Sequence, residues 1–242
     1  MKRTLILFFL AVTSLAISQS KFYNINEIHG ISLRETYSIC KDDNGFIWAS
    51  AKTGIIRITE NNYRIYQLPL EATNVHTIKL EYYNSTLIDF TNNGQFFVYD
   101  KLFDCFTLMI NMIDVLDNHF ISVNSVVFEN TNSIWVGTSF GLYRIDNNAL
   151  QQIHSENIQI SYISAYNENY LFIATLDGIG LFDKQSCKID YLYTYTIRDE
   201  MSVSMFLYDE DTRKLWVGTI SNGLFYYDMT SKSLLSYTQI TL

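Results

Sequence analysis

The segment Ser133–Asp146 reads SIWVGTSFGLYRID, which is typical of a β-strand, a tight turn and a second β-strand. The same pattern recurs in Ile47–Ile56 and Leu215–Asp228, and in weaker form in Leu87–Asp100 and Leu171–Asp183. A pattern repeated at this interval indicates a solenoid, a propeller or another repeat array before any other fold.

Each copy has a bulky anchor residue in its first strand: Trp48, Ile88, Trp135, Phe172 and Trp216. The anchors are 37 to 47 residues apart, which brackets the roughly 40–45 residues of a four-stranded propeller blade. In four copies a small residue follows two positions later. It lies on the same face as the anchor because strand side chains alternate in direction, and it leaves room for a neighbouring sheet. The second copy has Phe90 there, so we expect the second blade to be the least regular.

The turn after each first strand contains a glycine, and a hairpin turn needs a positive φ that glycine adopts without steric cost. The 18 tyrosines and 16 phenylalanines suit half-buried pleated surfaces, and no stretch has the spacing of an amphipathic helix. The sequence therefore predicts an all-β fold, a β-propeller of four-stranded antiparallel blades, with about five blades in this chain.

The strands expected nearest the propeller axis contain no Asp or Glu: Thr36–Cys40, Thr77–Lys79, Val123–Val127, Tyr162–Ala165 and Ser202–Phe206. Glycoside hydrolases need a pair of carboxylates flanking the sugar, so this composition argues against hydrolysis. Met109–Ile121 is the least periodic part of the chain. We expect a loop followed by a strand there, with a short helical turn as the alternative.

The N-terminus is typical of a secretory signal peptide, with basic Lys2 and Arg3, an apolar run over Thr4–Ala16 and small residues up to Ser18. We predict a signal peptide over residues 1–18 and a propeller domain over 19–242. The apolar run is shorter than the roughly 20 residues of a membrane span, and an uncleaved anchor is the alternative. Apart from this segment no transmembrane segment is predicted, so we expect a periplasmic or secreted protein.

The formal net charge is −8, which argues against nucleic acid or anionic lipid as partners. The three cysteines, Cys40, Cys105 and Cys187, have no C-x-x-C spacing. An odd number is unusual for a disulfide framework, so we expect small buried residues. One disulfide with one free thiol is the alternative, and the pairing is left open.

The sequence contains motifs that imitate catalytic or metal sites. Gly137–Gly141 spells G-x-S-x-G, but a nucleophile elbow needs a helix after it, whereas a second strand is predicted here. The acidic runs Asp42–Asp43 and Asp209–Asp211 could bind calcium, but both lie in predicted turns, where acidic residues are common. The G-x-G of Gly178–Gly180 lies inside a β repeat and carries no nucleotide signal.

The histidines are scattered, without the close pairing that a zinc site needs: His29, His76, His119 and His154. We therefore predict no catalytic residue, no metal site and no cofactor, and we do not expect an enzyme.

The repeat unit, with an Asp/Asn-Gly turn, Ile-Trp-Val-Gly-Thr and a Gly-Leu turn, resembles the two-component regulator propeller repeat. The beginning of the chain is similar to that family as well, in Gly30–Ser32, Tyr37–Asp42 and Asn44–Trp48. The resemblance covers nearly all of Phe22–Asp228 and is strongest in copies one, three and five. It implies the periplasmic sensor region of hybrid two-component histidine kinases, whose typical ligands are oligosaccharides released from complex glycans. Only the N-terminal portion of such a receptor is matched.

Propellers in that family have seven blades, so five copies imply either a closed five-bladed ring or part of a seven-bladed one. A partial ring would expose apolar blade faces to water, and we expect closure if the chain folds alone. Phe22–Ile25 is a predicted strand that would complete the last blade. Pairing with further blades, or self-association, is the other way to cover such faces.

The function expected from this resemblance is ligand recognition by a sensor outside the cytoplasm, with an oligosaccharide as the partner. Sugar faces stack on aromatic rings and their hydroxyls bind polar side chains, but the sequence does not identify the binding residues. A protein–protein interaction scaffold is the main alternative, and a five-bladed glycan-active enzyme is another.

Overall fold

The structure is a computed structural model that describes residues 35–52, 54–59, 62–69, 75–154, 158–196 and 201–237. Contacts divide the chain into two units, Met1–Leu33 and Arg34–Leu242, and the fold described below belongs to the second. The predicted signal peptide, the predicted strand at Phe22–Ile25 and His29 lie outside the described residues.

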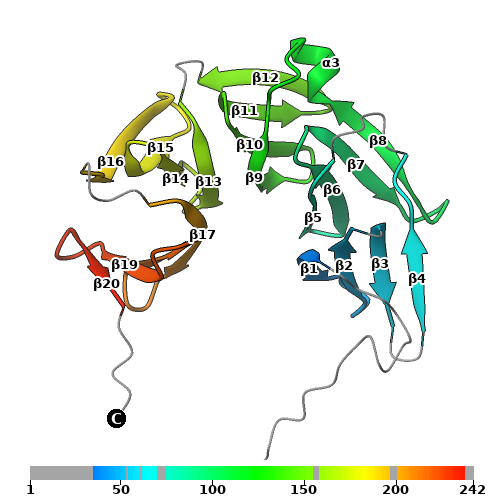
Figure 1. The fold of residues 1–242 in the computed structure, drawn as a ribbon, viewed down its shortest axis with the longest axis horizontal. Helices are drawn as coiled ribbons and strands as arrows, with labels where there is room; N and C mark the ends of the chain where they lie inside the picture. The colour runs from blue at the N-terminus through cyan, green and yellow to red at the C-terminus, as the bar shows by residue number, and fades with distance from the viewer. Residues whose placement is uncertain are drawn as a thin grey trace, which may run out of the picture. The chain divides into compact units, whose positions relative to one another are not determined.

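The described chain forms five antiparallel sheets of four strands, each strand paired with the next in sequence (Figure 1). Blade 1 consists of β1 (Thr36–Lys41), β2 (Ile47–Ala51), β3 (Gly54–Ile58) and β4 (Tyr63–Tyr66). Blade 2 consists of β5 (Ile78–Tyr83), β6 (Thr86–Thr91), β7 (Gln95–Asp100) and β8 (Cys105–Asn111). Blade 3 consists of β9 (Val123–Asn130), β10 (Ser133–Thr138), β11 (Gly141–Asp146) and β12 (Ala149–His154).

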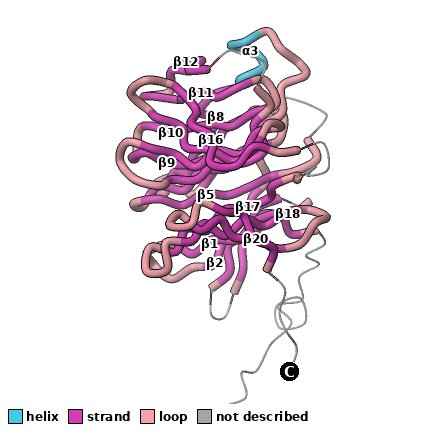
Figure 2. Tube along the Cα trace, turned by 90° about the vertical axis from the view of Figure 1, so that its left-hand side faces the viewer, coloured by secondary structure: helices cyan, strands magenta, loops and turns pink. Residues whose placement is uncertain are grey.

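Blade 4 consists of β13 (Ile160–Ala165), β14 (Tyr170–Thr175), β15 (Gly178–Asp183) and β16 (Lys188–Thr194). Blade 5 consists of β17 (Val203–Asp209), β18 (Lys214–Thr219), β19 (Leu224–Asp228) and β20 (Ser233–Ser236). The predicted β-propeller of four-stranded blades is therefore confirmed, and strands make up most of the described trace (Figure 2). The five predicted anchors lie on the second strand of the five blades.

The segment between β8 and β9 differs from the prediction of a loop plus a strand. Met112–Leu116 forms the short helix α3, after a strand that extends to Asn111. The Asn111 side chain caps the helix by accepting from the backbone N of Ile113 at 3.3 Å, and Asp117 ends it in the left-handed region with φ of 50°. Met112 is fully buried, so packing fixes a helix that is too short to be stable by itself.

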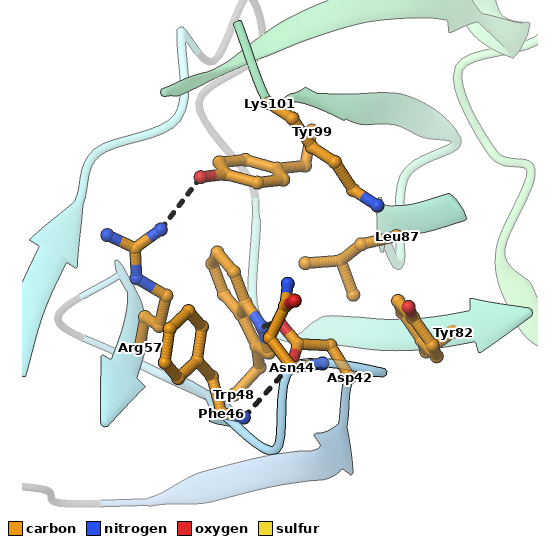
Figure 3. A pocket seen from close by; sticks show the side chains of 9 residues that line it. All are labelled: Asp42, Asn44, Phe46, Trp48, Arg57, Tyr82, Leu87, Tyr99 and Lys101. Carbon is orange, nitrogen blue, oxygen red and sulfur yellow. Dashed lines mark hydrogen bonds between the residues drawn. The ribbon is translucent and has the colours of Figure 1, made fainter. Parts of the chain in front are cut away.

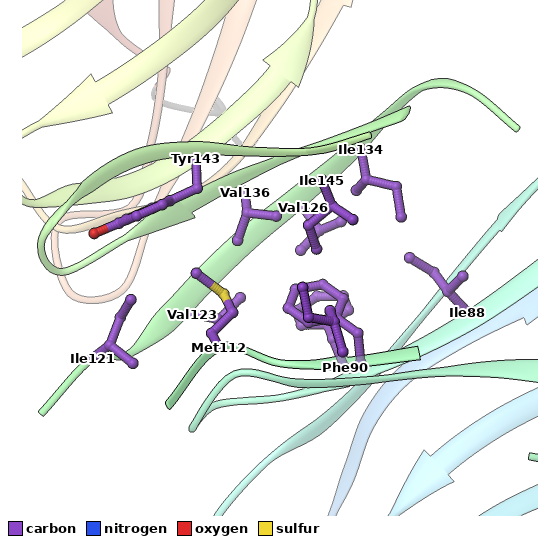
Figure 4. Close-up of a cluster of buried hydrophobic side chains, with 12 residues drawn as sticks. Ile88, Phe90, Met112, Ile121, Val123, Val126, Ile134, Val136, Tyr143 and Ile145 are labelled. Atoms are coloured by element: carbon purple, nitrogen blue, oxygen red, sulfur yellow. The ribbon is translucent and has the colours of Figure 1, made fainter. Parts of the chain in front are cut away.

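Blade 2 departs from the other blades in its strand pairing: β6 and β7 pair at three positions, against five or six in the corresponding pair of the other blades. Its first two strands pair without the register shift found in the corresponding pair of the other four blades. Phe90, in the place of a small residue, is 2% exposed and stacks on Phe96 at a ring-centroid distance of 5.8 Å. Figure 4 shows this ring in the apolar cluster that blade 2 forms with blade 3. The larger side chain is accommodated because Met112 and its neighbours pack around it.

Four clusters of buried apolar side chains hold the blades together, between blades 1 and 2, 2 and 3, 3 and 4, and 4 and 5. In each cluster the face that carries the anchor packs against the opposite face of the next blade. Among the described residues no such cluster joins blade 5 to blade 1. The five-bladed ring that we expected to close is therefore not closed by a core in this part of the chain.

Polar side chains connect the innermost strands, whose edges would otherwise present unpaired backbone groups. The backbone N of Leu80 donates to Ser38 Oγ at 2.7 Å, which links blade 2 to blade 1. Lys79 Nζ donates to the carbonyl of Asn124 at 3.0 Å, and Asn124 Nδ2 donates to the carbonyl of Ile160 at 2.7 Å. These bonds extend the contact between neighbouring blades beyond the apolar clusters.

Cys40, Cys105 and Cys187 are all free, so they form no disulfide, and they are half-buried, whereas we predicted small buried residues. Burial, with the nearby charges of Glu81 and Asp42, raises the pKa of the Cys40 thiol to about 12. This thiol is therefore protonated at neutral pH. Within the ranges described, no helix has the length and apolar character needed to span a membrane.

Candidate functional site

A pocket of about 190 Å³ lies between blades 1 and 2 (Figure 3). Aromatic and charged side chains line it together: Asp42, Asn44, Phe46, Trp48, Arg57, Tyr82, Leu87, Tyr99 and Lys101. The first five belong to blade 1 and the others to blade 2. We call this group the blade 1/2 pocket. Its walls are therefore built by two consecutive repeats and depend on their packing.

Asp42 occupies the turn between β1 and β2 and fixes one wall of the pocket. Its Oδ1 accepts from the backbone N of Asn44 at 2.9 Å and of Phe46 at 3.0 Å. Its Oδ2 accepts from Trp48 Nε1 at 2.9 Å. Both carboxylate oxygens are thus used within the turn, which agrees with the predicted turn and leaves this residue a poor calcium ligand.

Arg57 on β3 forms the base of the pocket. Its guanidinium lies 5.4 Å from the ring centroids of both Phe46 and Trp48, within the range of cation–π attraction. Its Nη1 donates to Tyr99 Oη at 2.8 Å and to Asp104 Oδ1 at 3.2 Å. Figure 3 shows the bond to Tyr99 spanning the space between the two blades. The guanidinium is therefore held in one orientation by groups from both blades.

Tyr82 and Lys101 form the opposite wall. The backbone N of Asp43 donates to Tyr82 Oη at 3.1 Å, and Ser85 Oγ donates to the Asp43 carboxylate. Hydrogen bonds to the Asp43 carboxylate, first from Ser85 and then from the Tyr82 hydroxyl, lower the pKa of Asp43 below its ordinary value. Lys101 follows β7 and is exposed. The wall therefore combines a fixed phenol with a solvent-exposed cation, whose charge also acts on the Asp43 carboxylate.

The corresponding place between blades 3 and 4 is occupied differently. Glu129 precedes its anchor, Trp135, by six residues, as Asp42 precedes Trp48, and Lys184 follows β15 as Lys101 follows β7. There Lys184 Nζ and Glu129 Oε1 form an ion pair at 3.2 Å, and Arg144 Nη2 contacts Glu129 Oε2 at 2.8 Å.

Between blades 1 and 2 the shorter carboxylate of Asp42 accepts a hydrogen bond from the indole of Trp48. The described residues show no ion pair between Asp42 and Lys101. The two interfaces share a plan, in which Arg57 and Arg144 lie over the anchors Trp48 and Trp135 at 5.4 and 5.5 Å. The first interface therefore keeps its lysine available, whereas the third uses it to join the blades.

The blade 1/2 pocket can bind a neutral or anionic polar ligand. The rings of Phe46 and Tyr82 are half-buried and offer apolar faces, while Asn44 and Lys101 are exposed and offer hydrogen-bond donors. Such a mixture of stacking surfaces with a few polar groups is typical of binding sites for small ligands. Among the described residues that line the pocket, Asp42 is the only carboxylate, so no pair of catalytic carboxylates converges there within this part of the chain.

The inner strands carry acidic residues, contrary to the prediction. The observed strand β5 runs to Tyr83 and so includes Glu81, while β9 includes Glu129 and β17 includes Asp209. The strands were predicted too short because these polar residues follow the last clearly apolar positions. Burial raises the pKa of Glu81 to about 7, and the Lys79 ammonium partly opposes the rise.

The motifs that imitate catalytic, metal or nucleotide sites lie in turns or within a strand. Ser139 lies in the turn before β11, where its Oγ accepts from the backbone N of Ser122 at 2.9 Å, so a strand and not a helix follows the G-x-S-x-G motif. Asp209 Oδ1 accepts from the backbone N of Asp211 at 3.1 Å and of Thr212 at 3.2 Å, as expected for a turn. Gly178–Gly180 belongs to β15.

His76 and His119 are exposed, and His154 lies at the end of β12. Over the described ranges, no group of three or more His, Cys, Asp or Glu side chains lies close enough to hold a metal ion.

Sequence reasoning missed Asp89, whose side chain is fully buried on β6. Neither of its carboxylate oxygens has a hydrogen-bond partner, and burial raises the pKa of this carboxyl well above its ordinary value. The equivalent positions in the other blades are apolar: Ala49, Val136, Ile173 and Val217. This difference among the repeats was the available signal.

No family model matches the sequence, and no curated protein matches it. Solved structures do match. One is the extracellular domain assigned to the hybrid two-component system BT3049 of B. thetaiotaomicron, with a TM-score of 0.66 and 16% identity. The match covers 88% of this chain and 31% of that one. The chain therefore spans about a third of the length of this structural neighbour.

Two further structures support the same fold. The extracellular domain assigned to the one-component system BT4673 of B. thetaiotaomicron matches with a TM-score of 0.53 and 16% identity, over 91% of this chain and 38% of that one. The WD40 β-propeller domain of Doa1 matches with a TM-score of 0.62 and 15% identity, over 83% and 67% of the two chains. At these identities the likeness establishes the β-propeller fold.

Proposed function

We propose that this chain is the ligand-recognition part of an extracytoplasmic sensor, and that it binds an oligosaccharide in the blade 1/2 pocket. The resemblance of its repeats to two-component regulator propeller repeats supports the sensor role, together with structural neighbours described as extracellular domains of one- and two-component systems. The predicted signal peptide is consistent with a periplasmic or secreted location.

The observation that carries the proposal is the availability of Lys101 and Asn44 beside the rings of Phe46 and Tyr82. An oligosaccharide would place a sugar face on one of these rings and its hydroxyls against the two exposed donors. Arg57 and Lys101 bring two cations to the pocket, with Asp42, Asp43 and Asp104 close to them, so the test includes sugars that carry a carboxylate beside neutral ones.

The test is a thermal-shift screen of the secreted protein against neutral and acidic oligosaccharides. A ligand present at 100 times its Kd should stabilise the folded protein by roughly 2.7 kcal/mol. The variants Asn44→Ala and Lys101→Ala should reduce this stabilisation without changing the stability of the free protein, because both side chains are exposed. Lys188→Ala, an exposed lysine on β16, is the matched control.

A glycan that stabilises all three variants to the same extent as the wild type would place the ligand elsewhere. A complete absence of stabilisation across the panel would contradict the proposed ligand class, and release of shorter products from the same glycans would indicate the enzymatic alternative.

A protein–protein scaffold is the second candidate function. Leu102 and Phe103, in the turn between β7 and β8, are 84% and 73% exposed, and apolar side chains of this size in solvent are typical of protein-interaction sites. The double variant Leu102→Ser and Phe103→Ser should abolish capture of a protein partner while leaving any glycan-induced stabilisation intact. Loss of glycan binding in that variant would contradict a separate scaffold role.

A further inference from the structure

Four of the five anchors are buried, and the fifth is not. Trp48, Trp135 and Phe172 are 1%, 3% and 0% exposed, and Ile88 is 1% exposed. Trp216 is half-buried and belongs to none of the four apolar clusters between blades. The aromatic rings observed next to Trp216 both belong to the same end of the chain, blade 5 and the residue that follows it. They are Tyr226 and Tyr237, at ring-centroid distances of 5.4 Å and 5.2 Å.

The same difference in burial is found on the third strand of each blade, at the position that pairs with the small residue two places after the anchor. Ile55, Leu142 and Ile179 occupy it in blades 1, 3 and 4, and each is 0% exposed. Leu224 occupies it in blade 5, paired with Gly218, and is 38% exposed. The same side chain position is therefore covered by a neighbouring blade three times and left open once.

The exposed apolar surface extends over all four strands of blade 5. Besides Trp216, Leu224 and Tyr226, it includes Met205, Leu207, Leu235 and Tyr237, which are 47%, 59%, 45% and 47% exposed. We call these seven residues the Trp216 face. The opposite side of the blade is different, because Phe206, Leu215, Val217 and Tyr227 are buried against blade 4.

The four interfaces within the chain define what such a face accepts. In each of them the anchor face contacts the opposite face of the next blade, and that face presents aliphatic residues from its second strand. These residues are Leu87 at the first interface, Ile134 and Val136 at the second, Leu171 and Ile173 at the third, and Leu215 and Val217 at the fourth. We propose that the Trp216 face binds a further propeller blade, from outside residues 35–237, that presents such an aliphatic face.

A second copy of the chain fits this surface less well. The centre of the aliphatic face of blade 1 is little exposed, since Ala49, Ile56 and Ile58 are 3%, 0% and 7% exposed, and Ile39 and Ile65 at the edges of that face are 63% and 44% exposed. Two Trp216 faces placed against each other would oppose two bulky anchors, which none of the four interfaces within the chain does. The partner is therefore an additional blade and not a symmetric dimer of this one.

The test extends the full chain by a second copy of Met201–Tyr237, in which Trp216 of the added copy is replaced by phenylalanine. The added blade then offers Leu215 and Val217 to the native Trp216. Because Trp48 and Trp135 are almost fully buried, acrylamide should quench mainly the emission of Trp216. In the extended chain we expect that quenching to be lost and the melting temperature to rise. A matched extension with L215D and V217D in the added copy should leave quenching as in the original chain.

Substitutions in the original chain provide a second measurement. Leu207→Asp and Leu224→Asp should change its melting temperature little, since both side chains are already in water, whereas Leu142→Asp at the buried equivalent should unfold it. In the extended chain Leu207→Asp should restore quenching of Trp216. The proposal would be overturned if acrylamide still quenched Trp216 in the extended chain, whether the added blade folded or not. A concentration-dependent dimer of the original chain in which Trp216 is protected would also overturn it.

Discussion

Gly137 lies directly against Ile160 of the next blade, and a Cβ atom at Gly137 would come within 2.8 Å of Ile160 Cγ2. The contact explains physically why a small residue follows the anchor there, because a larger one would force the two sheets apart. Gly137→Ala should therefore lower the free energy of unfolding by about 1–3 kcal/mol, the usual cost of overpacking a core. Urea-induced unfolding followed by circular dichroism measures the change.

A double-mutant cycle isolates this contact from other effects of the substitution. Ile160→Ala removes the Cγ2 atom and leaves a cavity, so it is destabilising by itself. In that background, however, Gly137→Ala should cost much less than in the wild type, because the clashing atom is gone. Equal costs in the two backgrounds would show that backbone preference and not the close approach of the blades selects glycine.

Because of Asp89, the free energy of unfolding should fall as the pH rises. The pKa of this carboxyl in the folded state is raised by burial, so the folded protein keeps a proton that the unfolded chain loses above pH 4, and stability falls as pH increases through that range. Asp89→Val, which matches Val136 in blade 3, should stabilise the protein by about 1–3 kcal/mol at pH 7 by removing an unpaired buried polar group.

Asp89→Asn separates charge from polarity, since it should remove the pH dependence of this site while leaving a buried polar group. Asp190→Asn, at an exposed position on β16, should change neither the stability nor its pH dependence. An Asp89→Val variant less stable than the wild type at pH 7 would show that the carboxyl has a partner when the protein is in solution.

Glu81 should contribute a second pH dependence. Burial raises its pKa from 4.5 to about 7, so the folded state binds the proton more tightly between these two values. Stability should therefore fall from pH 4.5 to pH 7 and stop changing above that. Glu81→Gln should remove this slope, which thermal unfolding at several pH values would reveal. An unchanged slope in Glu81→Gln would assign the titration to another group.

The fold could be predicted because the same sequence pattern occurs five times in the chain. The anchors, the turn glycines and the strand spacing depend on local chain geometry, and all of them read correctly from residue types alone. Closure of the ring could not be predicted in the same way, because Trp216 has the same sequence context as the buried Trp48 and Trp135. Whether an anchor is covered depends on the blade that follows it.

The candidate site was less predictable than the fold. Lys101 and Lys184 follow equivalent strands, but the carboxylates opposite differ: Asp42 is bonded within its own turn, whereas Glu129 lies on β9 and forms the ion pair with Lys184. Glu81 was missed because the predicted strand was set by its apolar residues and ended at Lys79. In the structure β5 continues to pair with β6 as far as Tyr83. Such differences depend on contacts between blades, which the order of residues within one repeat does not contain.

Asp104 should be the most important charge between blades 1 and 2. It lies before β8 and accepts hydrogen bonds from Arg57, Arg64, Tyr66 and Tyr99, three of them from blade 1. Asp104→Asn keeps a residue that tolerates the observed φ of 52° but removes the charge. It should lower the free energy of unfolding by about 1–3 kcal/mol, because a hydrogen bond to a charged group contributes more to stability than one between neutral groups.

Because the carboxylate is partly exposed to solvent, part of this loss should disappear at high ionic strength, where screening weakens the wild-type pairs. The measurement is urea unfolding of the wild type and Asp104→Asn at low and high salt, with Asp177→Asn as an exposed control. The same substitution should also loosen Arg57 and thereby weaken any ligand bound in the blade 1/2 pocket. Full stability of Asp104→Asn at low salt would show that the apolar cluster alone, and not this carboxylate, holds the two blades together.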